Sequence, residues 1–436
     1  MRPSFRLALC LLLPAWAAAQ SVDMGGGAHL NYQGNLGIAQ WAFPRKGGEG
    51  RSHFATAWLG EADLTFSLAP KVPVEFRIHP RFNYDPDRDE SGDEYTSLPT
   101  RFDDLYLDWF TRWFELRAGW QVFSWKVVES FSQADILNQA DRAEDFFDPP
   151  KIGEPAARAR FILPTRVQNV LELYYLPYFT PAPLPGPGSR YWFFPGKPVR
   201  VMRSADDYTY AVEEERWRPQ WAARWQTQLF ETFDVAAYYF HGYRRFPQLV
   251  PVGAPGPAGV VLTHHYSPIF QGGLTFQGAV GNWLWKGETA YIRSEADQIS
   301  PSGSVVDPYL AYTGGLEYTF YSPLIQNHDL GAILELIGDT DAGKDEDELE
   351  GFRPFRSHVF AGLRYVFNNP GDRSVLAGAF VDYLNGDLIY RAEYSERFFS
   401  RVSAKVDVSG LNAEPGSQFQ PFEKAIRLAA EAKVHF

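Results

Sequence analysis

Charged side chains are concentrated among aromatic residues in one segment, residues 122–156. Opposed charges that face each other across a narrow gap of low dielectric constant create a transverse field, which orders dipolar solutes and sorts ions by sign. The residues of this segment that could form such a constriction include Lys126, Asp135, Asp141 and Arg142. The alternative is that these charges pair with a surrounding wall or face external water.

A second group of residues with chemical potential is acidic. Asp339, Asp341, Asp345 and Glu350 place carboxylate oxygens at spacings that resemble those of a calcium-binding loop. However, Lys344 stands where such a loop needs a glycine for its tight turn, and no flanking helices are expected. A Ca²⁺ ion in residues 339–350, or Mg²⁺ bridging to lipopolysaccharide phosphates, is therefore a hypothesis beside solvated loop charge. No other cofactor is expected.

Catalysis and nucleic-acid binding find little support in the sequence. The nine histidines are scattered, and there is no phosphate-binding loop, no glycine-rich nucleotide motif and no zinc-ligand spacing. We therefore expect that the protein is not an enzyme. Its formal net charge of -12 argues against a nucleic-acid partner, because such a partner requires a basic face.

The first nineteen residues have the features of a secretory signal peptide. Arg2 and Arg6 precede an apolar stretch that ends in small residues, and this stretch is too short to span a bilayer as a helix. We expect residues 1–19 to be removed and residues 20–436 to form one domain. The single cysteine, Cys10, lies within the signal peptide, so the mature chain cannot be a small disulfide-stapled fold.

The dominant pattern in the remaining chain has a period of two residues. From Val72 onward, apolar side chains alternate with polar ones over thirteen residues, and similar alternation recurs in five further segments. Strands of about ten residues with one apolar and one polar face suit a wall between lipid and water, and they must close into a barrel because hydrocarbon cannot satisfy free backbone groups. The residues expected to line the lumen are Glu61, Asp63, Glu75, Arg77, Arg81, Glu115, Arg117 and Arg224.

The connections between the predicted strands alternate between long and short. Counting strands between them gives an all-β, transmembrane antiparallel β-barrel of about 18 strands with both termini on the periplasmic side. Sixteen strands is the alternative, because residues 26–40 and 399–410 are weakly patterned. The last alternating segment, residues 426–436, ends on Phe436.

Two features resemble a known family. The final strand resembles the C-terminal signal of bacterial outer-membrane barrels, and Arg117, Gly119, Gln121, Trp125 and the segment 135–141 resemble a motif of Gram-negative outer-membrane porin-like barrels. Lys126 and Gln139 depart from that motif, where the family has glycine and proline. The resemblance implies a channel for passive diffusion of small solutes in the outer membrane of a Gram-negative bacterium. It also implies contact with outer-membrane lipid, lipopolysaccharide and the barrel assembly machinery.

One long connection, residues 178–200, suggests an alternative function. Its prolines favour an extended chain, and Tyr191, Trp192, Phe193 and Phe194 could offer a surface to an apolar solute or a glycan. A barrel that transfers hydrophobic molecules or lipids with a periplasmic partner is therefore the alternative to the channel. Packing of these aromatic side chains against other loops or the lipid interface is the simpler explanation.

Overall fold

The computed structural model describes most of the chain, in ranges separated by short gaps. The described residues are 20–25, 28–43, 54–68, 72–84, 100–185, 191–194, 199–202, 216–251, 259–295, 307–344, 353–399, 401–423 and 425–435. The expected signal peptide and Phe436 lie outside them. Within the described residues, no helix is long and apolar enough to cross a membrane.

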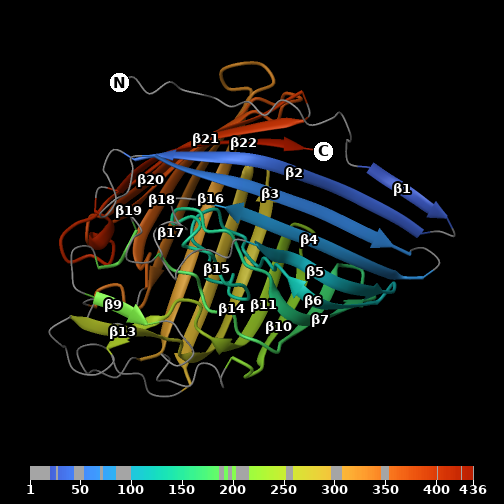
Figure 1. The fold of residues 1–436 in the computed structure, drawn as a ribbon, viewed down its shortest axis with the longest axis horizontal. Coiled ribbons are helices and arrows are strands. Elements are labelled where there is room, and N and C mark those ends of the chain that lie inside the picture. The colour runs from blue at the N-terminus through green and yellow to red at the C-terminus, as the bar shows by residue number, and fades with distance from the viewer. Residues whose placement is uncertain are drawn as a thin grey trace.

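Eighteen described strands pair with their neighbours in one antiparallel sheet that closes on itself (Figure 1). The closing pair is β2 with β22, in register from Asn35 opposite His435 to Ala42 opposite Leu428. The strands of the barrel are β2 (Ala28–Ala42), β3 (Phe54–Ser67), β4 (Val74–Tyr84), β5 (Thr100–Phe110), β6 (Phe114–Gln121), β7 (Glu154–Leu163), β8 (Asn169–Leu176), β10 (Gln220–Leu229), β11 (Phe233–Tyr243), β14 (Pro268–Val280), β15 (Trp283–Ser294), β16 (Tyr309–Tyr321), β17 (Asp329–Asp339), β18 (Ser357–Val366), β19 (Ser374–Asp382), β20 (Leu388–Phe398), β21 (Val402–Asn412) and β22 (Ala425–His435).

The predicted number of eighteen strands is confirmed, and sixteen is not. The two weakly patterned segments that motivated sixteen form β2 and β21, each paired on both sides. Their neighbours in the sheet supply the hydrogen-bond partners that a strand needs, whatever its local pattern.

Among the residues that the structure describes, five small elements lie outside the barrel strands. β1 (Gln20–Gly25) pairs with the first residues of β2, beyond the end of β22. β12 (Gln248–Pro251), β13 (Val260–His265) and β9 (Val199–Met202) form a separate sheet, in which β9 runs parallel to β13. This small sheet joins two long connections and was not predicted, and a 3₁₀ helix, η3 (Gln420–Phe422), lies in the last long connection.

The alternation of long and short connections is also confirmed, with one brief link, residues 383–387 between β19 and β20, on the side of the long ones. The short ones include residues 111–113, 230–232 and 281–282, and the third long one is residues 122–153. The tight turn at 230–232 places Phe230 and Glu231 at positive φ angles of 54° and 56°, which matches the twist of the flanking strands. We call residues 122–153 the third loop.

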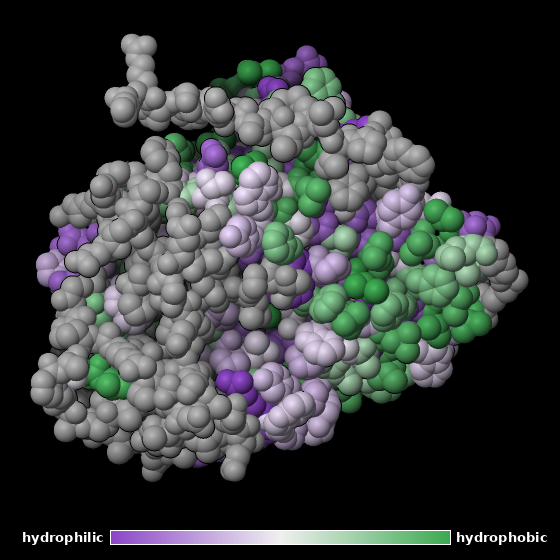
Figure 2. Space-filling view, in the orientation of Figure 1, coloured by the Kyte–Doolittle hydropathy of each residue, from purple (hydrophilic) through white to green (hydrophobic). Residues whose placement is uncertain are grey.

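The outer face of the barrel is apolar, as the alternation predicts. Large apolar side chains on alternate positions of the strands are exposed, among them Trp58, Leu107 and Leu334. Figure 2 shows hydrophobic side chains gathered on the right of this view, where β4 to β7 lie in Figure 1. An exposed belt of this extent favours contact with lipid acyl chains.

Candidate functional site: the lumen and the third loop

The third loop, which joins β6 to β7, folds into the barrel. It is held there by a buried glutamate on β15, on a different part of the barrel wall. Both carboxylate oxygens of Glu288, on β15, accept hydrogen bonds from the loop, and this residue is only 2% exposed. Oε1 accepts the N–H of Val127 at 2.7 Å, and Oε2 accepts the N–H of Gln133 at 2.8 Å and the hydroxyl of Ser132 at 2.6 Å. These bonds satisfy backbone donors that would otherwise be buried without a partner.

A second glutamate holds the same part of the loop. Glu335, on β17, is 1% exposed and accepts the N–H groups of Glu129 and Ser130, each at 2.8 Å. The hydroxyl of Ser130 also donates to Glu335, and Thr313 on β16 donates to the carbonyl of Phe131 at 2.8 Å. Four neighbouring strands, β14 to β17, thus bind the loop, because Gln271 on β14 donates to Gln133 as well.

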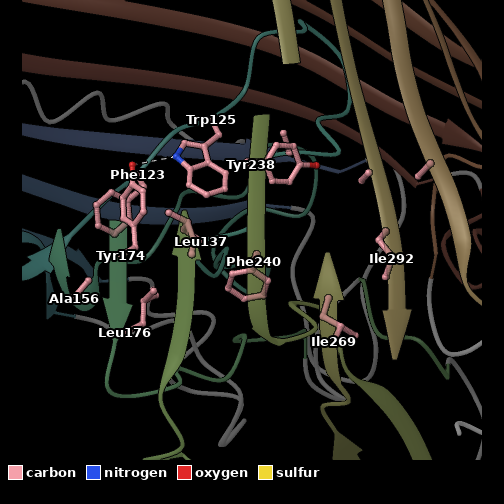
Figure 3. Close-up of a cluster of buried hydrophobic side chains, with 14 of the residues drawn as sticks. Phe123, Trp125, Leu137, Ala156, Tyr174, Leu176, Tyr238, Phe240, Ile269 and Ile292 are labelled. Atoms are coloured by element: carbon pink, nitrogen blue, oxygen red, sulfur yellow. Dashed lines mark hydrogen bonds between the residues drawn. The ribbon is translucent and has the colours of Figure 1, made fainter. Parts of the chain in front are cut away.

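Apolar packing fixes the base of the loop on the inner wall (Figure 3). Trp125 lies between Tyr174 on β8 and Tyr238 on β11, with ring centroids 5.4 Å from each, and its indole N–H donates to the Tyr174 hydroxyl at 3.3 Å. Phe240 and Leu137 belong to the same cluster and are fully buried. On this wall the loop and the barrel share a hydrophobic core, so the inner face of the barrel is not polar throughout.

The acidic part of the loop pairs with arginines on the other wall. Asp141 accepts a hydrogen bond from Arg101 on β5 at 3.0 Å, and Glu144 binds Arg81 on β4. Asp145 lies 2.8 Å from a guanidinium nitrogen of Arg427 on β22. The loop therefore spans the lumen, bound to glutamates on one wall and to arginines on the other.

Asp148 follows Asp141, Glu144 and Asp145 on the loop, and we call these four residues the acidic row. The Asp148 carboxylate lies 3.0 Å from Arg391 on β20. Burial alone would raise the pKa of Asp148, but the attraction of Arg391 and Lys405 outweighs it and lowers the pKa. The alternative that these loop charges pair with the wall is thus what the geometry shows for the acidic row.

Five of the predicted lumen residues lie near the short connections, away from the third loop; they are Asp63, Glu75, Arg77, Glu115 and Arg117. Arg77 binds Asp63 at 2.7 Å and lies 3.4 Å from Asp104. Glu75 is opposite Asp108 in the register of β4 and β5. Arg77 with Asp63 and Asp104 forms the first part of a ladder of ion pairs along the inner wall.

The second part of the ladder lies on β5 to β7. Arg117 donates two hydrogen bonds to Asp108, at 2.9 and 2.6 Å, and covers the ring of Tyr106 at 4.1 Å. Glu115 binds Arg158 and lies 3.4 Å from Arg160. The sequence therefore placed these side chains on the inner face of the barrel. It did not reveal that they lie nearer the short connections than the third loop does.

The remaining predicted constriction residues lie on the third loop itself. Lys126 donates to the carbonyl of Glu129 at 2.7 Å, and Asp135 pairs with Lys151 at 2.5 Å. Arg142 lies over the ring of Phe246 at 5.0 Å. Of the predicted residues, only Arg81 and Asp141 come together across the lumen, through their shared neighbour Glu144.

The residues that sequence reasoning missed are the wall partners of the loop. Glu288 and Glu335 stand at inward positions of ordinary alternating strands, as do Arg101 and Arg427. Nothing in their local sequence distinguishes them from other inward charges. A charged residue at an inward position is a candidate anchor only once the loop's path is known.

Two of the four proposed calcium ligands, Asp339 and Asp341, bind an arginine side chain. Asp339 and Asp341 accept hydrogen bonds from Arg353 at 2.5 and 3.0 Å. Asp345 and Glu350 lie outside the described residues, and within the described part of the chain no group of three or more candidate ligands is found. Calcium binding by residues 339–350 therefore stays a prediction.

Calcium titration would test that prediction. If the acidic connection binds Ca²⁺, the ion should raise the unfolding midpoint, since binding to the folded state alone stabilises it by about 2.7 kcal/mol at a hundredfold excess over Kd. Asp345→Asn with Glu350→Gln should remove this shift in thermal unfolding monitored by circular dichroism. Identical midpoints with Ca²⁺ and with a chelator would contradict the calcium hypothesis.

The aromatic residues of the connection 178–200 are packed against other loops. Tyr191 stacks on Phe146 of the third loop at 4.8 Å, and Phe193 contacts Phe422 at 5.1 Å. Trp192 is buried and packs against Leu262. Packing between loops, the simpler of the two explanations, is therefore the one that the structure supports.

Two cavities lined by described residues border the third loop. The first has a volume of about 270 Å³ and is lined mainly by charged side chains, among them Arg81, Glu144 and Lys433. The second has a volume of about 600 Å³ and is lined by aromatic and cationic side chains, among them Phe131, Tyr309 and Arg142. The loop thus divides the lumen into spaces of different chemistry.

Comparison with known proteins finds similarity in fold only. No family model matches the chain, and no curated protein matches it. Similar solved structures include opdK, an outer membrane protein from Pseudomonas aeruginosa (8% identity, TM-score 0.48, 93% of this chain and 98% of that chain), and OmpF of Salmonella typhi in complex with daunomycin (11%, 0.47, 96% and 100%). OmpT, an outer membrane protein of Vibrio cholerae, is similar at 9% identity and a TM-score of 0.42, over 96% of this chain and 100% of that chain. Similarity at this level carries no argument about function, so the barrel rests on its own strand pairing.

Proposed function

We propose that this protein is a porin-like channel of a Gram-negative outer membrane, through which small solutes diffuse passively. The observation that carries the proposal is a closed barrel with an exposed apolar belt, charged side chains on its inner wall and a long loop anchored across its lumen. An apolar belt requires lipid, and a charged lumen crossed by a loop is suited to selecting solutes by size and charge. That the protein is not an enzyme stays a prediction.

The final strand supports a proposal about assembly. β22 alternates buried inward residues such as Arg427 and Ala429 with exposed outward ones such as Leu428, and it closes the barrel against β2. We propose that the barrel assembly machinery binds this strand and inserts the chain among outer-membrane lipids and lipopolysaccharide.

Ion selectivity tests the channel. We expect single-channel current steps in planar bilayers, and a shift of ion preference toward cations when Arg77→Glu and Arg81→Glu are combined, because both side chains face the lumen. The reversal potential in a salt gradient should move by tens of millivolts, on the order of what rings of charge produce in pores. Arg77→Gln with Arg81→Gln should give about half the shift.

The control replaces arginines outside the lumen. Arg112→Glu with Arg166→Glu makes the same change in net charge at the short connections, where both side chains are exposed. It should move the reversal potential much less. Absence of current from protein that is folded in the bilayer would indicate a plugged barrel and overturn the proposed function.

A further inference from the structure

The larger cavity beside the third loop is bordered by phenyl rings that contact one another. The ring of Phe131, on the loop, has its centroid 4.9 Å from that of Phe355, in the connection before β18. Phe355 in turn lies 4.8 Å from Phe380 on β19 and 5.7 Å from Phe419 in the last long connection. All four rings line the cavity. The third loop, the barrel wall and two other connections therefore build one apolar surface together.

A second group of rings borders the same cavity. Phe146 and Phe147 of the third loop lie 5.6 Å apart, and Phe193 and Phe246 lie 6.2 Å apart. These four rings also line the cavity. Phe422, which is only 2% exposed, supports them from behind and contacts Phe146 at 4.6 Å and Phe193 at 5.1 Å. Because the inner face of an outer-membrane barrel is usually polar, two groups of phenyl rings at one cavity are unusual.

Contacts between the rings do not bury them fully. Phe131, Phe355 and Phe380 remain partly exposed, and a cavity of about 600 Å³ lies against them. Packing between loops accounts for the ring contacts, but it does not fill this space. Apolar surface that water covers is unfavourable in proportion to its area, so a solute with an apolar surface of its own would gain by displacing that water.

The carboxylates that line the cavity are neutralised within the protein. Asp135 pairs with Lys151 at 2.5 Å, and Asp339 pairs with Arg353 at 2.5 Å. Asp148 lies 3.0 Å from Arg391. A cationic solute would have to displace one of these partners before it could bind a carboxylate here.

The other cations that line the cavity are also bound by groups of the protein. Lys126 and Arg245 donate to backbone carbonyls, and Glu154 attracts Arg245 as well. Arg244 donates to the Tyr309 hydroxyl at 2.9 Å, and Arg142 lies over the ring of Phe246 at 5.0 Å. A charged solute would lose hydration on entry and compete with these contacts, whereas an uncharged one would meet neither cost.

We propose that this cavity binds uncharged compounds with two or three fused aromatic rings. An apolar cavity of about 150 Å³ holds one benzene molecule, so a volume of about 600 Å³ suits a body of this size. Rings such as Phe131 and Phe355 can contact it in offset-stacked or edge-to-face arrangements. The inference deepens the proposed function and rests on it, because a solute must enter the lumen to reach this cavity.

Blockade of ion current by matched probes tests the site in the wild-type protein. In planar bilayers, 1-naphthalenemethanol should interrupt the current at a concentration at least about tenfold lower than glucose, a neutral solute of similar mass without an aromatic ring. 1-Naphthoate, which has the same rings and a negative charge, should block no more strongly than the alcohol. Tenfold stronger blockade by naphthoate would show that charge selects the solute and would overturn the inference. Equal effects of the alcohol and glucose would overturn it too.

Variants locate the site. Phe131→Ala removes a ring from the cavity and should raise the blocking concentration of 1-naphthalenemethanol about tenfold. Phe276→Ala removes the same ring from the outer face of β14, where it is 41% exposed, and should leave that concentration unchanged. Equal effects of the two variants would indicate action through the lipid and contradict the assignment.

Calorimetric titration separates this inference from the proposed function. 1-Naphthalenemethanol is titrated into nanodisc-reconstituted protein, and the heat from empty nanodiscs is subtracted. Saturable binding to a protein that carries no current would retain the site and reject the channel. Current without saturable binding would retain the channel and reject the site.

Discussion

Removing both anchors of the third loop is expected to open the lumen. In a variant with Glu288→Ala and Glu335→Ala, the N–H groups of Val127, Glu129, Ser130 and Gln133 lose their acceptors. An unsatisfied buried donor costs about 1–3 kcal/mol. In the variant the free energy is therefore lower when the loop leaves the wall and water accepts these hydrogen bonds. A loss of about 3 kcal/mol would shift the equilibrium between anchored and released loop about a hundredfold.

Single-channel conductance measures this release directly. The double variant should show larger and noisier current steps than the wild type, and the loop should become a substrate for added protease. Glu288→Gln should have a smaller effect, because the amide oxygen still accepts a hydrogen bond. Glu75→Ala removes an inward carboxylate far from the loop and serves as the matched control for Glu288→Ala. Unchanged conductance in the folded double variant would show that the anchors do not hold the loop.

The second large effect concerns the outer face. Leu334 lies at the middle of β17, points outward and is 55% exposed. Leu334→Arg should destabilise the protein in lipid vesicles by about 2–4 kcal/mol, the cost of a cation at the bilayer midplane. Guanidinium unfolding followed by tryptophan fluorescence would measure the difference.

The same substitution in a short connection provides the control. Leu324 is 78% exposed in the link between β16 and β17. Leu324→Arg should cost only about 0–1 kcal/mol, because arginine near the interface reaches water. Equal destabilisation by the two variants would place the apolar belt outside the hydrocarbon and contradict the membrane location.

The third loop contacts the two walls through different kinds of interaction. Salt should therefore weaken the attachment of one half of the loop more than that of the other. The acidic half, at Asp145 and Asp148, depends on ion pairs with Arg427 and Arg391, which salt screens where water reaches them. The half at Trp125 depends on aromatic packing and on hydrogen bonds to buried glutamates, which salt affects little.

The sequence alone predicted the barrel, about eighteen strands with sixteen as the alternative, and the two faces of the strongly alternating strands. These properties follow from a period of two residues, which is local: Val74 and Glu75 must point to opposite faces of a strand whatever surrounds them. The sequence also identified the third loop as the connection with the most potential for selectivity.

Only the tertiary structure decided how the lumen is filled. Val127 and Glu288 are 161 residues apart in the chain, and their hydrogen bond depends on strands that meet only when the barrel closes. The pairing of Asp141 with Arg101 and the packing of Trp125 on Tyr238 are likewise contacts between distant segments. Local patterning fixes which face a side chain occupies, whereas its partner is fixed by closure, because closure brings separate walls within reach of one loop.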